Sequence, residues 1–300
     1  MTMTSAELEG QVAVVTGAGR GIGRAVAIAL ANAGMTIAAL ARTQFEVGET
    51  AALIEKAGGR AQSFVADVTD GDVIQATMNR VAASLGPVEL LVNNAGQLGR
   101  IGPFVDGDPA EWWRVLDTNL RGPMLSTRAV LPGMIARRRG RIINIASSPV
   151  PLPYLSAYVT SKTALLRFTE TVAAETRAAG VYLFAVGPGT TRTAMSEHSL
   201  YSEEGRKWIP WFARVFEEKL DVPVERPAQL VVKLASGYAD ALSGQLLSVS
   251  DDLNVLQQRL EEVERHHLYS LRVRKLDEVP APPALAEILR AAEQGVGGSK

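Results

Sequence analysis

Short apolar runs alternate with segments of helical periodicity along most of the chain. The run Val12–Thr16 has no polar alternation, as expected for a parallel strand that helices cover on both faces. Strands are predicted at Val12–Thr16, Thr36–Ala41, Ser63–Ala66, Leu90–Asn93, Arg141–Ala146, Val181–Val186 and Gln245–Ser250. Helices are predicted over Ile22–Ala33, Phe45–Lys56, Val73–Leu85, Pro109–Arg138 and Ala157–Ala179. This order predicts an α/β fold, a doubly wound parallel sheet with helices on both faces.

The alternation is interrupted by a long insertion at 193–227, which separates the Val181–Val186 strand from the helix that follows. No repeat or low-complexity linker divides the residues before 250. We therefore expect one domain over 1–250 that contains the insertion, and a C-terminal extension over 251–300.

The extension begins with an apolar stripe at helical spacing, Leu253, Leu256, Leu260 and Val263. This stripe predicts a helix over 252–267 that packs on its own domain or on a neighbouring subunit. Asp252 is expected to cap that helix rather than to bind a cation. The Pro-, Ala- and Gly-rich end of the chain is expected to be a partly flexible tail.

Composition narrows the classes of function. The 300 residues carry 31 Lys and Arg against 32 Asp and Glu, a net charge of -1, so no basic excess favours nucleic acid or an anionic membrane. Cysteine is absent and only three histidines occur, which leaves no thiol nucleophile, no expected metal site and little material for a Ser-His-Asp triad. Neither a secretory signal nor a membrane span is predicted. We expect a cytoplasmic protein that acts on a small molecule.

A glycine-rich loop stands where the first predicted strand meets the first predicted helix. Its sequence, Thr16-Gly17-Ala18-Gly19-Arg20-Gly21-Ile22-Gly23, permits a tight turn and close approach of a phosphate to the backbone. The positive end of the helix would face the pyrophosphate of a dinucleotide. A purely structural turn is the alternative, which the strand-to-helix position disfavours. We predict a Rossmann-like cofactor site with contacts from Gly17, Gly19, Arg20, Gly21, Ile22 and Gly23.

The residues after the second predicted strand bear on the choice between NAD and NADP. An acidic side chain there would accept from the ribose 2′-hydroxyl of NAD. The strand ends instead in Ala41-Arg42-Thr43, and Arg42 together with Arg20 is able to grip a 2′-phosphate. We therefore expect NADP(H) rather than NAD(H). The alternative is that both arginines are solvated surface charges.

A candidate for proton transfer is Tyr158, which lies four residues before Lys162 on a predicted helix and so on the same face. An adjacent ammonium is expected to lower the pKa of the phenol, so that Tyr158 exchanges a proton with a substrate oxygen near neutral pH. Ser147 directly follows the fifth predicted strand and is expected to donate to that oxygen; its neighbour Ser148 is the alternative. Tyr and Lys at this spacing are commonly surface neighbours, but the serine and the glycine loop favour catalysis.

Taken in order, these residues resemble the motifs of the short-chain dehydrogenase/reductase family. The matching positions are Thr16–Gly23, Asp67-Val68, Asn93-Asn94-Ala95-Gly96, Asn119, Ser147, Tyr158 with Lys162, and Pro188-Gly189 with Thr193. The resemblance covers residues 10 to 250 of the chain. It implies a seven-stranded parallel sheet in the order 3-2-1-4-5-6-7, hydride transfer between NAD(P) and a carbonyl or alcohol, and a homodimer or homotetramer.

The resemblance also implies roles for particular residues. Asp67 and Val68 would contact the adenine, and Thr193 would hold the nicotinamide carboxamide. Lys162 would bond the nicotinamide ribose, and Asn119 would anchor a proton-relay water beside the catalytic residues. The implied cofactor-binding residues outside the glycine loop are Asp67, Val68, Asn94, Ala95, Gly96, Tyr158, Lys162, Pro188, Gly189, Thr190 and Thr193.

Aromatic residues crowd the insertion. The hypothesis that Trp208, Trp211, Phe212 and Phe216 wall an apolar substrate pocket competes with packing in the core or at a subunit interface. We predict an oxidoreductase that transfers a hydride between NADP(H) and a secondary alcohol or ketone of a small, hydrophobic organic substrate. The rivals are a non-catalytic NADP-binding regulator and a dehydratase or epimerase on the same fold.

Overall fold

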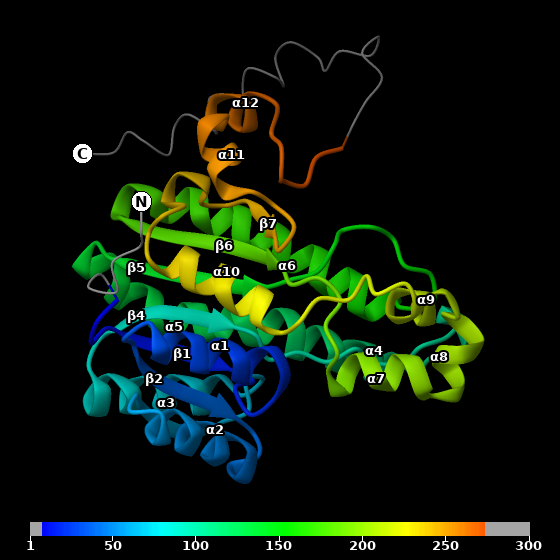
Figure 1. The fold of residues 1–300 in the computed structure, drawn as a ribbon, viewed down its shortest axis with the longest axis horizontal. Helices are drawn as coiled ribbons and strands as arrows, with labels where there is room; N and C mark the ends of the chain where they lie inside the picture. The colour runs from blue at the N-terminus through cyan, green and yellow to red at the C-terminus, as the bar shows by residue number, and fades with distance from the viewer. Residues whose placement is uncertain (1–7, 274–300) are drawn as a thin grey trace.

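A computed structural model of the chain describes residues 8–273, which form a parallel sheet between two layers of helices (Figure 1). The sheet has seven strands in the order β3-β2-β1-β4-β5-β6-β7, and all neighbouring pairs are parallel. Both the strand order and the doubly wound α/β fold are thereby confirmed. The strands are β1 Val12–Thr16, β2 Thr36–Ala41, β3 Arg60–Val65, β4 Val88–Asn93, β5 Gly140–Ile145, β6 Val181–Gly187 and β7 Leu246–Ser248.

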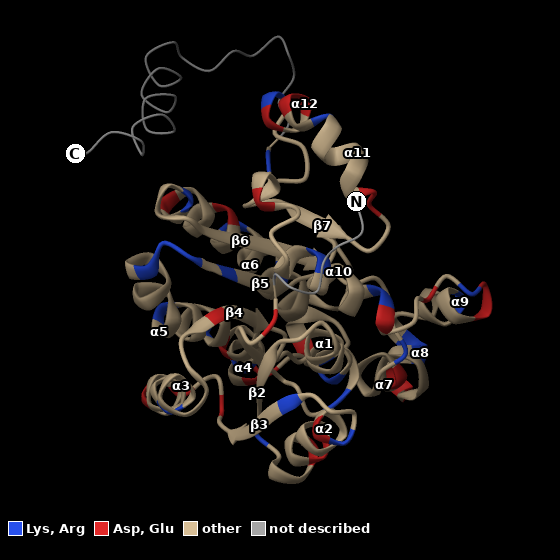
Figure 2. Ribbon diagram, turned by 60° about the vertical axis from the view of Figure 1, so that its left-hand side comes forward, with Lys and Arg blue, Asp and Glu red and all other residues tan. Residues whose placement is uncertain are grey.

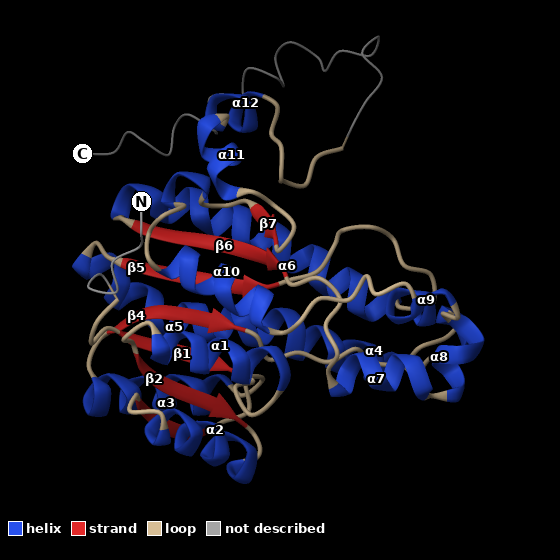
Figure 3. Cartoon of the chain, in the orientation of Figure 1, coloured by secondary structure: helices blue, strands red, loops and turns tan. Residues whose placement is uncertain are grey.

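Alternate residues of each central strand face opposite helical layers. Ala13 and Val15 of β1 pack with helices α1, α2 and α10, whereas Val12 and Val14 pack with α3, α5 and α6. Every residue of β1 is buried, which explains its unbroken apolar sequence. Figure 3 shows the layers as blue helices on either side of red strands. The helices named here are α1 Gly21–Asn32, α2 Gln44–Lys56, α3 Gly71–Leu85, α5 Gly122–Arg137, α6 Ser156–Thr176 and α10 Glu225–Ala235.

The single helix predicted over Pro109–Arg138 is wrong. The structure has α4, Pro109–Leu116, then a wider turn of π type over Asp117–Arg121, then α5. Pro123 stands in the first turn of α5, where its missing N–H interrupts the regular bonding of a continuous helix. The wider turn carries Asn119, which is fully buried.

The insertion forms three short helices, α7 Ala194–Tyr201, α8 Glu203–Trp208 and α9 Trp211–Glu217. They lie together beyond the carboxyl ends of the strands, on the side to which the arrows point in Figure 1. Ligands of open parallel sheets bind at this edge. The insertion is therefore placed beside the candidate site.

The extension begins with two helices, not the single one predicted over 252–267. These are α11, Leu253–Gln258, and α12, Leu260–Arg265; nothing in the sequence around Arg259 marks the break. The apolar stripe packs on its own domain, because Leu253, Leu256 and Val263 are buried in the core beside α10. Asp252 caps α11 by accepting from the Asn254 N–H at 2.8 Å, as predicted. The partly flexible tail predicted at the Pro-, Ala- and Gly-rich end of the chain lies outside the described residues.

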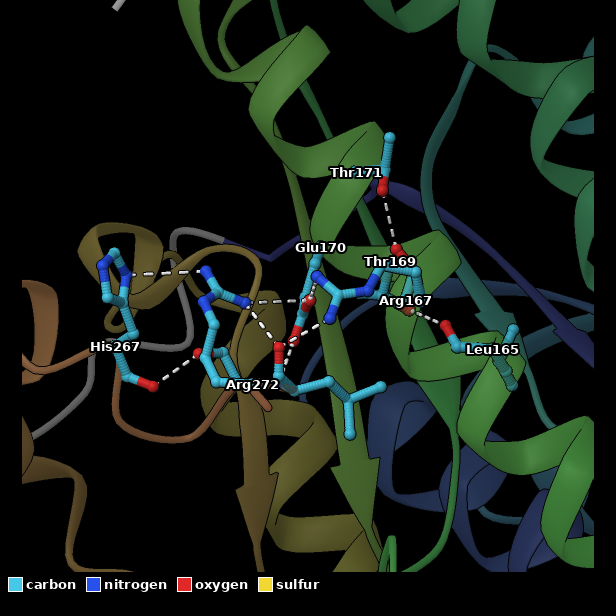
Figure 4. Close-up of polar contacts among 9 residues, drawn as sticks. Leu165, Arg167, Thr169, Glu170, Thr171, His267 and Arg272 are labelled. Carbon is cyan, nitrogen blue, oxygen red and sulfur yellow. Dashed lines mark hydrogen bonds and ion pairs between the residues drawn. The ribbon is translucent and has the colours of Figure 1, made fainter. Parts of the chain in front are cut away.

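The last described residues return to α6 (Figure 4). The Leu246 N–H of β7 donates to the carbonyl oxygen of Tyr269 at 2.8 Å, so the segment 268–272 lies along the edge of the sheet. The Leu271 N–H donates to Glu170 Oε1 at 2.6 Å, and Arg167 Nη1 lies 2.5 Å from Glu170 Oε2. The extension is thus fastened to the helix that carries Tyr158.

Lys and Arg positions and Asp and Glu positions both occur along the outer helices (Figure 2). Three arginines near the end of α5 and the start of β5 pair with carboxylates. Arg137 Nε lies 3.4 Å from Glu89 Oε1 and Arg139 Nε lies 3.3 Å from Glu89 Oε2. Arg141 Nη2 lies 2.6 Å from Asp240 Oδ2. Among residues 8–273 no helix combines the length and the apolarity that crossing a membrane requires.

Candidate active site

The glycine loop joins β1 to α1 in a conformation that requires glycine. Gly17 and Gly21 have φ of 64° and 54°, the left-handed region that residues with a Cβ avoid. A Cβ on Gly17 would lie 2.9 Å from the Cα of Ala95, and one on Gly23 would collide with the carbonyl oxygen of Gly17. The loop therefore needs glycine both for its turn and for close packing of α1 on β1.

The N-terminus of α1 is open to a ligand. The N-cap residue Arg20 makes no side-chain hydrogen bond to the helix, and the first turn contains no acidic residue. Arg24, one turn into α1, braces the loop by donating from Nε to the carbonyl oxygen of Gly19 at 2.9 Å. An uncapped helix start beside glycine backbone fits the pyrophosphate of a dinucleotide, which would take the place of a capping side chain. Ile22 lies in this first turn.

Asn94 and Ala95 hold the glycine loop against the end of β4. Asn94 Nδ2 donates to the carbonyl oxygens of Thr16 at 3.0 Å and Gly17 at 3.2 Å. The backbone N–H groups of Asn94 and Ala95 both donate to Thr16 Oγ1, at 3.0 and 3.1 Å. The structure thus gives Asn94 a definite part in shaping the candidate cofactor loop.

Arg20 and Arg42 both lie at this edge of the sheet and are exposed. The Arg20 side chain is 71% exposed, with Nη1 3.7 Å from Glu46 Oε1; the Arg42 side chain is 75% exposed, with Nη1 3.8 Å from Asp67 Oδ2. Such loose, solvated ion pairs are weak. Both guanidiniums are therefore available to an incoming anion.

Asp67 and Val68 follow β3 beside Arg42. Burial works against ionisation of Asp67, but hydrogen bonds from the N–H and hydroxyl of Thr69 and the nearby Arg42 outweigh it and lower the pKa of the carboxyl. Val68 is buried, and a Cβ on Gly122 would lie 2.8 Å from its Cγ2. The pair thus joins the end of β3 to the start of α5.

Three of the four residues predicted for catalysis, Ser147, Tyr158 and Lys162, come together at the start of α6. Ser147, two residues after β5, lies close enough to Tyr158 to lower the pKa of the phenol. Lys162 is buried and donates from Nζ to the carbonyl oxygen of Ile145 at 2.7 Å. Two consecutive elements, β5 and α6, therefore place a hydroxyl, a phenol and an ammonium at one end of β5, while Ser148 is exposed.

The expectation that Lys162 lowers the pKa of Tyr158 is wrong in this structure. Burial raises the pKa of Tyr158, and only the hydrogen bond from Ser147 acts to lower it. Burial also lowers the pKa of Lys162 to about 8, because removing an ammonium from water disfavours its charged form. The four-residue spacing of Tyr158 and Lys162 in the sequence does not reveal that both side chains are removed from water. Tyr158 is accordingly held as the neutral phenol, the form that donates a proton.

Asn119 connects the loop after β4 to α6. Its Oδ1 accepts from the Gln97 N–H at 2.8 Å, and its Nδ2 donates to the carbonyl oxygen of Gln97 at 2.9 Å and to Ser161 Oγ at 3.0 Å. Ser161 Oγ donates in turn to the carbonyl oxygen of Tyr158 at 2.7 Å. Neither Gln97 nor Ser161 was predicted as a site residue. The one sequence feature that pointed to Ser161 is its position directly before Lys162.

The segment from Pro188 to Thr193 closes over the glycine loop. A Cβ on Gly21 would lie 3.3 Å from Thr193 Cγ2, so the two segments are in contact across the candidate cofactor site. Thr193 also caps α7 in a reciprocal pair with Ser196. Gly189 has φ of 70°, and the carbonyl oxygen of Thr190 accepts from the Val222 N–H at 2.8 Å. This bond ties the segment to the part of the insertion that follows α9.

The insertion contributes an apolar wall beside Tyr158. Ile101, Leu155 and Ile209 form a buried cluster, against which Tyr158, Trp208 and Phe212 are packed. Arg192 Cζ lies over the Phe216 ring, 4.7 Å from the ring centre. The Trp211 side chain is exposed. Phe212 stacks edge to face with Trp211 and with Phe216, and Trp208 and Phe212 share the apolar cluster with Tyr158. That these residues wall a substrate pocket stays a prediction.

Comparison with known proteins gives matches over most of the chain. The family model described as short chain dehydrogenase matches residues 11–204. The chain is 41% identical over 194 residues to a short chain dehydrogenase of Pseudocercospora fijiensis, and this covers 63% of the chain and 62% of the relative. It is 36% identical over 260 residues to 2-(S)-hydroxypropyl-CoM dehydrogenase 3 of Xanthobacter autotrophicus, and this covers 84% of the chain and 100% of the relative.

Solved structures with the same fold include proteins bound to either nicotinamide cofactor. A metagenomic short-chain oxidoreductase in complex with NADP has a TM-score of 0.64 and 35% identity, over 77% of this chain and 92% of that one. An NAD⁺-bound xylitol dehydrogenase has a TM-score of 0.74 and 28% identity, over 80% of this chain and 98% of that one. These neighbours support a nicotinamide cofactor.

Proposed function

This chain belongs to the short-chain dehydrogenase family, and we propose that it reduces a ketone to a secondary alcohol, or catalyses the reverse oxidation, with NADP(H). The observation that carries the proposal is the placement of Ser147 close enough to Tyr158 to act on its phenol, one helical turn from the buried Lys162. A hydroxyl and a neutral phenol at one point suit protonation of an oxygen that is gaining negative charge.

A nicotinamide cofactor supplies or accepts the hydride when bound. In the reducing direction Tyr158 Oη donates its proton to the substrate oxygen, while Ser147 donates a hydrogen bond to the same oxygen and stabilises its developing charge. Burial keeps Tyr158 protonated by raising its pKa, so the reduction suits neutral pH. In the oxidising direction the phenolate accepts the proton from the alcohol, and the rate should rise with pH.

The glycine loop, Thr193 and Lys162 are assigned to cofactor binding. The loop would hold the pyrophosphate at the open start of α1, and Thr193, which contacts Gly21 across the site, would hold the carboxamide. Lys162 Nζ is fixed by the Ile145 carbonyl oxygen and would bond the nicotinamide ribose. Gly96 is exposed and adjoins Lys162, since a Cβ on it would lie 3.6 Å from Nζ.

The proposed preference for NADP rests on Arg20 and Arg42. Both side chains are exposed and only loosely paired with carboxylates. A 2′-phosphate would therefore form charge-assisted hydrogen bonds with them at the expense of only weak ion pairs. Asp67 also lies at this point, and its lowered pKa keeps it ionised. The NAD alternative would use Asp67 as an acceptor for the ribose hydroxyl, and comparing the dissociation constants of NADPH and NADH decides between them.

The proposed substrate is hydrophobic. Trp208 and Phe212 pack against the apolar cluster that includes Tyr158, so a substrate oxygen at Tyr158 would place its carbon skeleton beside aromatic side chains. We also propose a homodimer or homotetramer in the cytoplasm, which light scattering and cell fractionation would test.

The direct experiment is to follow NADPH consumption against pooled ketones, sugars, quinones and steroids, with product analysis. Consumption with a hydrophobic ketone supports the proposal. NADPH binding without turnover on any pool favours the non-catalytic regulator, and product formation without net change in NADPH favours a dehydratase or epimerase.

A further inference from the structure

Gln97 directly follows the Asn93–Gly96 motif and forms hydrogen bonds with the wider turn that carries Asn119. Its backbone N–H and carbonyl oxygen bond the two ends of the Asn119 amide at 2.8 and 2.9 Å. Its side chain reaches the same turn, since Nε2 donates to the carbonyl oxygen of Arg114 at 2.6 Å and to Thr118 Oγ1 at 3.0 Å. Backbone and side chain of one residue thus hold both the turn and the amide that the turn presents.

The turn is of an uncommon kind. Residues Asp117–Arg121 are wound more widely than the helices on either side, and wide turns of this kind are rare and occur frequently at functional sites. Thr118 Oγ1 donates to the carbonyl oxygen of Arg114 at 3.1 Å, so Gln97 Nε2 completes a three-membered set of bonds across the junction between α4 and the turn.

The position of the turn is transmitted to the catalytic helix. Asn119 Nδ2 donates to Ser161 Oγ, and Ser161 Oγ donates to the carbonyl oxygen of Tyr158. On its other side Asn119 Oδ1 adjoins Gly96, where a Cβ would lie 3.2 Å from it and 3.6 Å from Lys162 Nζ. Displacing the turn would therefore disturb the helical turn between Tyr158 and Lys162.

We propose that the side chain of Gln97 is a positioning residue of the active site: it fixes the Asp117–Arg121 turn, and through Asn119 and Ser161 it sets the placement of Tyr158. The inference rests on the proposed function for its catalytic readout. Gln97 touches neither the reacting atoms nor the cofactor in this account, so its loss should lower kcat and leave cofactor affinity unchanged.

The test compares Gln97→Leu and Gln97→Glu with wild type. Gln97→Leu removes the donor at similar size and should lower kcat about tenfold, as loss of a hydrogen bond in a strained junction implies, with the NADPH dissociation constant unchanged. Gln97→Glu should lose as much at pH 8 and recover toward wild type only as the pH falls below about 4.3, the ordinary pKa of a glutamate, where a protonated carboxyl again donates to the Arg114 carbonyl oxygen. The matched control is Gln75→Leu, which removes an amide that bonds only Asn79 on α3.

A kcat for Gln97→Leu equal to that of Gln75→Leu overturns the inference, as does a loss in Gln97→Glu that does not depend on pH. Hydrogen exchange gives a readout without turnover. The backbone amides of 116–122 should exchange faster in Gln97→Leu than in wild type, and unchanged exchange overturns the inference even if no substrate is found. If the wild-type protein turns over no substrate but the backbone amides of 116–122 exchange faster in Gln97→Leu, the proposed function is overturned and the role of Gln97 in holding the turn is not.

Discussion

The Ser147 side chain, two residues after β5, lies close enough to Tyr158, in the first turn of α6, to act on the acidity of its phenol. Burial raises the pKa of the phenol and Ser147 opposes the rise, because a hydroxyl that donates to the phenolate favours the ionised form. Ser147 therefore bears directly on the acidity of the proposed proton donor.

Replacing Ser147 by alanine should lower kcat about a hundredfold, since one donor to the developing oxyanion is lost. It should also move the rise of kcat with pH in alcohol oxidation to higher pH, because burial, the remaining influence on the Tyr158 phenol, raises its pKa. Stopped-flow rates from pH 6 to 10 measure both effects. Ser148→Ala, at the exposed neighbour, is the control; equal losses in the two variants would contradict the assignment.

Lys162 should make the stability of the cofactor-free protein depend on pH. Its pKa is lowered from 10.5 to about 8 in the folded chain, so between these values the unfolded chain binds more protons, and the free energy of unfolding rises with pH. The gap corresponds to about 3 kcal/mol.

The Lys162→Met variant should lack this rise, so its stability relative to wild type should fall between pH 8 and 10.5. Urea unfolding at a series of pH values measures the difference. Lys56→Met, at the exposed end of α2, controls for loss of a lysine charge. A difference between Lys162→Met and wild type that stays constant with pH would show that Lys162 is not buried as an ammonium.

Arg42→Ala should weaken NADPH binding by roughly tenfold or more, the worth of a charge-assisted bond, and should leave NADH binding unchanged or tighter. Nicotinamide fluorescence titration gives both dissociation constants. Arg259→Ala removes an exposed arginine that pairs only with Glu262 on the extension and serves as the control. Equal weakening of both cofactors by Arg42→Ala would remove the basis for a 2′-phosphate site.

Glu170→Ala should destabilise the protein by about 1–3 kcal/mol, because the Leu271 N–H and two arginines lose their acceptor. The Glu170 side chain is only 13% exposed, so water replaces it poorly. Thermal unfolding measures the loss, with Glu261→Ala, at a 94% exposed side chain, as control. An unchanged melting temperature would mean that the 268–272 segment does not hold α6.

The sequence was sufficient for the sheet because its information is local. The unbroken apolar run of β1 and the glycines beside it predict a buried parallel strand and a phosphate loop without reference to other segments. The wider turn at Asp117–Arg121 was missed, since helical periodicity continues through it and only the tertiary bonds of Asn119 and Gln97 make that winding favourable.

The pKa of Tyr158 was misjudged for a related reason. Spacing places Lys162 on the same helix face, but it does not reveal that the ammonium is buried and bonded to the carbonyl oxygen of Ile145. Tyr158 packs against the cluster of Ile101, Leu155 and Ile209, which is assembled from three distant segments.

The central claim is that Tyr158 donates the proton in an NADPH-dependent reduction. The most direct measurement is the single-turnover rate of NADPH oxidation with the best ketone, in wild type and in Tyr158→Phe, after fluorescence titration has shown equal NADPH binding. The account predicts a rate at least about a hundredfold lower in the variant, the contribution of a positioned general acid. A Tyr158→Phe variant that binds NADPH and oxidises it at the wild-type rate would contradict the account.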